Sequence, residues 1–248
     1  MDEEGPPGLL AAVREGDEDA VVRLLRAGAS AETADEDGQT VLYLAAVADT
    51  PGIVRLLLAA GADPDRLSGG TDVPLCGAAC GGHEQVVRAL LAVGAAVDLE
   101  EEYGFRALTW AVRLGHAGVV VALLAAGADP DRPGPGGEPP LVAAARRGSP
   151  GCVRALLAAG AGAREEALAE ARRWVAADVA AELRAGLEAA YGAGPGYRYR
   201  VRRFVAEKGA PTVEVTLARD GRVVAGDDRQ LGHAAIVTEL LGRARGNG

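Results

Sequence analysis

The sequence predicts a mostly α-helical solenoid followed by a small α+β module, and three observations lead to this prediction. A Gly-Ala step recurs every 33 residues, at Gly28-Ala29, Gly61-Ala62, Gly94-Ala95, Gly127-Ala128 and Gly160-Ala161, and a fixed period of this length is typical of stacked repeats. The chain of 248 residues is 49% hydrophobic, which is enough to build a core. After residue 196 the apolar period changes from that of a helix to the period of two that marks a strand.

Each repeat unit reads as two short helices. One leucine recurs in register, at Leu9, Leu42, Leu75, Leu108 and Leu141, and small residues follow it three positions later. A glycine such as Gly82 can then end the first helix by adopting a positive φ. The next residue, for example His83 or Ser149, is expected to cap the second helix. Paired leucines give that second helix a buried stripe.

This pattern resembles the ankyrin repeat, most closely at residues 38–46 and 82–87. The resemblance covers residues 5–163, with repeats expected at about 5–33, 34–66, 67–99, 100–132 and 133–163. It implies a stack with β-hairpin fingers on one side and a concave face lined by the first helices. In the fourth unit Arg106-Ala107-Leu108-Thr109 replaces the usual Thr-Pro-Leu-His box, so its first helix lacks the usual cap and proline.

The C-terminal third departs from the period. Residues 164–191 are predicted to be a degenerate sixth helix pair that caps the stack, and a single long helix is the alternative. Residues 192–196 read as a linker. Residues 197–248 are predicted to form a β-β-β-α module, because tyrosines alternate with arginines from Tyr197 and a turn follows at Asp220-Gly221. Residues 232–237 imitate the start of an ankyrin second helix, but no first helix precedes them, so we do not expect them to form part of a repeat.

Charge and cysteine content limit the cellular environments and the classes of partner that we expect for this protein. Residues 1–163 carry a net charge of −11 and residues 164–248 one of +2, which gives −9 for the chain. An acidic repeat block argues against general nucleic-acid binding. The acidic N-terminus predicts no secretory signal, no run is long enough to span a membrane, and three cysteines suggest no disulfide framework. We therefore expect a cytoplasmic monomer.

Catalytic motifs are not evident in the sequence. We find no nucleophile motif, phosphate loop or paired-carboxylate signature. Cys76, Cys80 and His83 suggest zinc only weakly, because a fourth ligand is missing. His83 and His116 occupy one repeat position, which favours a structural role. The expectation is a protein without catalytic activity, cofactor or metal.

The binding surface is expected on the concave face and the fingers, at positions that the resemblance implies. These residues are Asp37, Gln39, Asp72, Tyr103, Phe105, Trp110, Arg113, Leu114, Glu138, Arg146 and Arg147. Tyrosine and phenylalanine beside arginine are typical of interaction hot spots, although Phe105 and Trp110 can equally pack between repeats. The predicted function is a scaffold that binds a protein or peptide, with an acidic segment placed against the three arginines.

Two alternatives remain open at this stage. The alternating Arg198, Arg200 and Arg202, with Arg203, can track a phosphate backbone while Tyr197 and Tyr199 stack on bases. However, a sheet whose tyrosines pack inward explains the same pattern. An enzyme or ligand-binding protein with its site in the groove is the other alternative, and no motif supports it.

Overall fold

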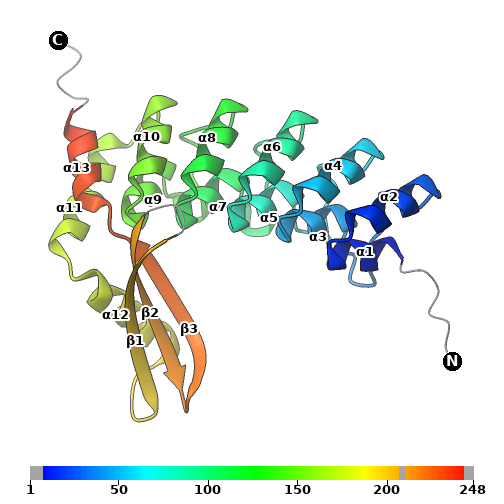
Figure 1. Cartoon of the computed structure of the whole chain (residues 1–248). Helices are drawn as coiled ribbons and strands as arrows, with labels where there is room; N and C mark the ends of the chain where they lie inside the picture. Colours follow the sequence, from blue (N-terminus) through cyan, green and yellow to red (C-terminus); the bar gives the residue numbers. More distant parts are fainter. Residues whose placement is uncertain (1–7, 207–209, 243–248) are drawn as a thin grey trace. The chain divides into compact units, whose positions relative to one another are not determined.

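The structure of the protein, a computed structural model, describes residues 8–206 and 210–242 (Figure 1). The chain forms two compact units, residues 1–138 and 139–248. The fold is mostly helical, with a small antiparallel sheet near the C-terminus, as the sequence predicts.

Within residues 8–138, unit 1 contains four helix pairs. The first helices are α1 (Leu9–Glu15), α3 (Val41–Val47), α5 (Pro74–Gly81) and α7 (Ala107–Leu114); the second helices are α2 (Glu18–Arg26), α4 (Pro51–Ala59), α6 (Glu84–Ala92) and α8 (Ala117–Ala125). Figure 1 shows each kind of helix in its own row. The core between the rows consists of the predicted leucines with alanine and valine, and Leu42, Leu75, Leu90 and Leu108 are buried.

Left-handed residues end the first helices, as the sequence predicts. Gly16, Gly82 and Gly115 follow α1, α5 and α7 with φ between 72° and 79°. In the second repeat Asp49 adopts φ 52° at the equivalent position. Aspartate is one of the few residues other than glycine that visit this region, so the period survives the substitution.

The histidines, in contrast, do not cap the second helices. His83 and His116 precede α6 and α8 but make no side-chain cap hydrogen bond. Their Nε2 atoms instead lie 3.2 Å from the carbonyl oxygen of Val47 and 3.0 Å from that of Cys80. These carbonyls lie near the ends of the first helices of the preceding repeats, so the two histidines join neighbouring repeats.

The fingers turn through a backbone hydrogen bond that also recurs with the period. The amides of Asp35, Ser68, Glu101 and Gly134 donate to the carbonyls of Gln39, Asp72, Phe105 and Glu138, over 2.8–3.0 Å. Short 3-10 turns, η1 (Glu102–Gly104) and η2 (Pro135–Gly137), form the last two finger tips. In the earlier fingers the strands meet through single bridges, Ala34–Thr40 and Ser68–Asp72.

The described residues of unit 2, 139–206 and 210–242, form a fifth helix pair, two longer helices, the sheet and a last helix. The helices are α9 (Pro140–Arg147), α10 (Pro150–Ala158), α11 (Arg164–Ala176), α12 (Val179–Tyr191) and α13 (His233–Gly242); the strands are β1 (Tyr197–Val205), β2 (Pro211–Arg219) and β3 (Arg222–Gln230). The strand order is β1-β2-β3, and both pairings are antiparallel. The predicted β-β-β-α order is therefore present.

Helix α12 covers one face of this sheet. Its Leu183 and Leu187 pack on Val213, Val215 and Leu217 of β2 and form a separate small core. The tyrosines of β1 lie half-buried on the same face. Helices α11 and α12 are thus two helices, but α12 packs on the sheet, which differs from the expected packing of residues 164–191 as one ankyrin-like pair.

The partner of α11 is α13. The two run antiparallel, because Arg164 at the start of α11 donates to the carbonyl of Leu240 at 2.6 and 2.9 Å while Trp174 near its end stacks on His233, with ring centroids 5.8 Å apart. Helix α11 packs on α9, and α13 packs on α10. This is how the first and second helices of successive repeats contact each other in unit 1.

His233 shows that α13 occupies the second-helix position of a sixth repeat. Its Nε2 lies 3.2 Å from the carbonyl oxygen of Arg146, and Arg146 stands two periods after Cys80, which accepts from His116. The apolar residues Ile236, Val237, Leu240 and Leu241 also follow His233 at the spacing that follows His83. Residues 177–232 are therefore inserted between the two helices of a split repeat.

Candidate functional site

An aromatic and cationic stack lies on the fourth repeat of unit 1. The rings of Phe105, at the end of a finger, and Trp110, on α7, are stacked with centroids 4.4 Å apart and planes 18° apart. The Cζ of Arg113, one turn along α7 from Trp110, lies 5.4 Å from the centre of the Phe105 ring. Both rings are partly exposed and Arg113 is exposed. The three side chains are adjacent, and tryptophan and arginine are residue types enriched among those that dominate binding energy in protein interfaces.

Glu101 fixes this stack to the neighbouring repeat. Its Oε2 accepts a 2.8 Å hydrogen bond from the indole Nε1 of Trp110, and its Oε1 accepts a 3.1 Å bond from the amide of Val73. The first bond orients the indole, and the second joins two fingers. Surfaces that are ordered before binding lose less entropy when a partner arrives.

Tyr43, which the sequence analysis did not select, belongs to the adjoining surface in repeats two and three. Its ring lies over Gly77, where a Cβ atom would come within 2.9 Å of its Cε2. Burial, together with Asp72 and Glu101, raises the pKa of Tyr43 to about 12. A hydrogen bond between the phenol and the Asp72 carboxylate contributes to this rise in pKa, so the hydroxyl already has a partner in the third finger. The ankyrin resemblance implied binding positions elsewhere on the first helices and not at Tyr43. The one signal in the sequence for Tyr43 is Gly77, whose lack of a side chain leaves room for the tyrosine ring.

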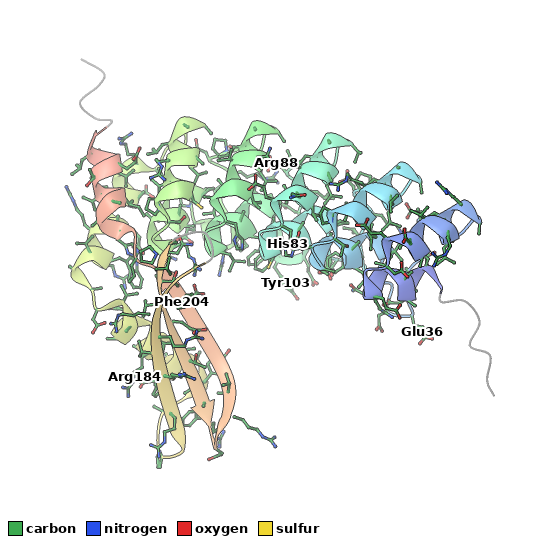
Figure 2. The ribbon with its side chains drawn as sticks, in the orientation of Figure 1. Glu36, His83, Arg88, Tyr103, Arg184 and Phe204 are labelled. Atoms are coloured by element: carbon green, nitrogen blue, oxygen red, sulfur yellow. The ribbon has the colours of Figure 1, made fainter. Side chains whose placement is uncertain are left out.

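Tyr103 stands at the tip of the fourth finger with 80% of its surface exposed. Figure 2 shows it, like Glu36 of an earlier finger, on the side of unit 1 where the fingers lie, away from Arg88 on α6. Its backbone is left-handed, with φ 67° and ψ 13°. The equivalent positions in the third and fifth fingers are Gly70 and Gly136, also with positive φ. A tyrosine in this conformation is unusual and carries strain.

The other predicted positions in unit 1 surround these residues. Asp37 is exposed at a finger tip, and Leu114 is half-buried at the end of α7. The Oε1 of Gln39 accepts from Ser68 Oγ at 3.3 Å, and Asp72 accepts from Thr71 at 3.2 Å. The carbonyl of Glu138 closes the fifth finger. Within the fingers, Gln39 and Asp72 therefore act through their side chains and Glu138 through its backbone.

Arg146 and Arg147 lie in unit 2, where both already have partners. Arg146 Nε donates to Glu170 Oε1 at 3.0 Å. Arg147 is 8% exposed and donates to the carbonyl and the Oδ2 of Asp228 in β3, at 2.8 and 2.6 Å. The two arginines therefore connect α9 to α11 and to the sheet.

Arg106 has a structural role that the sequence analysis did not foresee. It is 1% exposed, and its Nη2 donates to the carbonyls of Arg132 and Pro133 in the next finger, at 2.7 and 2.8 Å. Its Nη1 lies 3.5 Å from Asp98 Oδ1. The side chain gives α7 no cap. The helix without the usual cap and proline is accompanied by an arginine that joins two fingers.

The cysteines show no sign of reactivity. Burial raises the pKa of Cys76 and Cys80, and that of Cys152 to about 11, with smaller electrostatic and hydrogen-bond contributions. Among the residues that the structure describes, no three histidine, cysteine or acidic side chains gather as a group that could hold a metal ion. In the same part of the chain, no helix is both long enough and apolar enough to span a membrane.

Comparison with known families agrees with the architecture. A family model described as ankyrin repeats (3 copies) matches residues 1–68, 52–134 and 75–167, which together extend over more than half of the chain. The comparison with curated proteins gave no match. With a recurring helix pair, finger and inter-repeat contact, and with this match, the chain belongs to the ankyrin-repeat family.

Proposed function

We propose that this protein is a scaffold that binds a segment of a partner protein on the finger and first-helix surface of the fourth repeat. Ankyrin repeats are generally protein–protein interaction modules, and proteins built from them are typically not enzymes. The observation that carries the proposal is the stack of Arg113, Phe105 and Trp110, which lies beside an exposed tyrosine.

The chemistry of this surface suggests what the partner presents. Phe105 and Trp110 offer ring faces for an apolar side chain. Arg113 makes no ion pair within the described parts of the chain, so an acidic group of the partner can meet it. Arg146 and Arg147 are engaged within unit 2. The proposed site therefore does not include these two arginines, and Arg113 is the residue that would meet an acidic segment of the partner.

Backbone strain at Tyr103 supports the same surface. A non-glycine residue in the left-handed region is less stable than glycine there. Glycine occupies the same place in the neighbouring fingers, so the fold itself does not require a tyrosine at this position. An exposed side chain that is kept in a strained position is reasonable if it contacts a partner.

We also propose that the protein acts in the cytoplasm.

Affinity capture from the native host, followed by mass spectrometry, tests the proposal. The full chain is compared with a Phe105→Ala, Arg113→Glu double variant and with an Arg55→Glu control. Arg55 is exposed on the second helix α4, so the control introduces the same charge change away from the proposed surface.

The double variant should keep its helical circular dichroism and lose a partner that both the wild type and the control retain. Removal of two hot-spot side chains commonly weakens binding by about 2 kcal/mol or more for each. If the double variant captures the same partners with undiminished affinity, the surface on the fourth repeat is not the binding site.

A further inference from the structure

The outer strand of the sheet has an open edge. β1 is nine residues long and lies at the edge of the sheet, and no other strand within residues 8–206 and 210–242 pairs with its free side. In an antiparallel sheet, alternate backbone N–H and C=O groups of an edge strand point away from the sheet. An edge of this length can receive a further strand.

One face of this edge is basic. Arg198, Arg200 and Arg202 are exposed and lie on the face opposite α12, since they pair with Ala218, Thr216 and Glu214 in β2. Arg202 forms an ion pair with Glu214 at 3.3 Å. Arg198 and Arg200 form no ion pair with any residue in the described ranges. The face therefore carries positive charge that the sheet does not neutralise.

The opposite face of the same edge is partly apolar, with Val201 and Val205 on either side of Arg203. Val201 and Val205 lie on the side of α12 but are 44% and 68% exposed, because α12 packs mainly on β2 and β3. A strand added beside β1 would cover part of both side chains. Its own side chains would alternate between an arginine column and a valine column.

We propose that β1 binds an extended segment of a partner protein in which acidic residues alternate with apolar ones. Backbone hydrogen bonds to the edge would supply part of the affinity, and the alternating side chains would supply the specificity. This site consists of residues of unit 2 and shares none with the stack on the fourth repeat, so the proposal does not rest on that function.

A second copy of the chain is a poor occupant of this edge. Antiparallel pairing of two β1 strands about Val201 would place Arg200 opposite Arg202, and like charges directly opposite each other are destabilising. In-register parallel pairing would align each arginine with its equivalent. Charge complementarity therefore points to an acidic strand of another protein.

Nucleic acid fits the edge less well than a peptide does. Bases would need aromatic faces beside the arginines, but the tyrosines of β1 lie on the other face of the sheet. The hydroxyl of Tyr197 donates to the carbonyl of Tyr191 at 3.0 Å, and the Cζ of Arg184 lies 4.4 Å from the centre of the Tyr199 ring. Phe204, which Figure 2 labels together with Arg184 of α12, is the aromatic residue of β1 on the arginine face. The Cζ of Arg202 lies 5.5 Å from the centre of its ring, so one face of this ring is already covered by a side chain of the same strand.

The test is binding of a fluorescent peptide in which glutamate alternates with valine and threonine, measured by anisotropy with the full chain. Two more probes are a scrambled peptide of the same composition and the alternating peptide with N-methyl groups on every second backbone nitrogen. A short single-stranded DNA is the fourth probe. The alternating peptide should bind at least about tenfold more tightly than the scrambled peptide, the N-methylated peptide and the DNA.

The matched variants are Arg200→Glu and Arg203→Glu. Both change the charge of β1 equally, but Arg203 pairs with Val213 and lies on the other face. Arg200→Glu should weaken peptide binding by about tenfold, because it exchanges a cross-strand attraction for a repulsion, while Arg203→Glu should change it much less. Equal losses in the two variants, equal binding of the N-methylated peptide, or tighter binding of DNA would each overturn the proposal.

Discussion

Replacement of Tyr103 by glycine is expected to stabilise the repeats around it. Tyr103 holds φ 67° and ψ 13° at the tip of a finger, with 80% of its surface exposed. The left-handed conformation costs a residue with a Cβ roughly 1–2 kcal/mol. Glycine avoids this strain but loses about 0.5–1 kcal/mol more backbone entropy on folding. Little burial is lost with the exposed ring, so the net gain should be about 0.5–1 kcal/mol.

Urea unfolding followed by circular dichroism measures this gain, and Tyr103→Ala is the matched comparison. Alanine also removes the ring but keeps a Cβ, so it retains the strain and should not share the gain. In a thermal unfolding experiment on a protein of this size, the midpoint of the glycine variant should lie about 1–4 °C higher. A glycine variant no more stable than the alanine variant would refute the argument that the backbone of Tyr103 is strained. The glycine variant should also bind the partner less well if the tyrosine contacts it.

Two further predictions concern buried side chains. Arg106→Ala should lower the free energy of unfolding, measured with urea, by about 3 kcal/mol, because two carbonyls of the next finger and a nearby carboxylate lose a buried cation. The control Arg113→Ala, which removes an exposed side chain, should change it hardly at all. Similar small losses in both variants would contradict the conclusion that Arg106 joins the two fingers. Burial, assisted by Arg229, lowers the pKa of His233 although its bond to the carbonyl of Arg146 opposes this. The unfolded chain therefore takes up the proton first, and stability that is complete above about pH 6.5 should decline as the pH falls towards the folded pKa. His233→Gln should make stability depend less on pH in this range, and an unchanged pH profile would exclude the mechanism.

The repeats could be predicted from the sequence because their stabilising contacts are local and recur. A leucine such as Leu42 or Leu75 contacts the same neighbours in each unit, so a fixed spacing reports its burial. The glycine that ends the first helix has an equally local cause, which also explains why Asp49 substitutes for it. The aromatic residues of the fourth repeat were found in the same way, from their place in the repeat.

The fate of Arg146 and Arg147 could not be predicted because it depends on contacts distant in sequence. Arg113 and Arg146 hold the same position in their repeats, but only Arg146 meets an acidic side chain of a later helix, Glu170. Arg147 meets Asp228, which no periodicity relates to it. His233 is an intermediate case. Its motif was visible in the sequence, but the first helix that it needs lies before the inserted sheet.

The split sixth repeat has a consequence for how the chain folds during synthesis. A repeat made of adjacent helices can close as soon as both have left the ribosome, but α11 must wait until residues 177–232 have been made before α13 arrives. Each doubling of the length of a loop raises the entropic free-energy cost of bringing its ends together by about 0.6 kcal/mol. If α12 and the sheet fold first, the flexible part of the chain between α11 and α13 becomes shorter. The C-terminal helix would then seal the end of the fifth repeat as the final step. A chain that stops after Tyr191 would leave the apolar side of α10 uncovered. Premature termination should therefore produce an aggregation-prone fragment rather than a shorter functional protein.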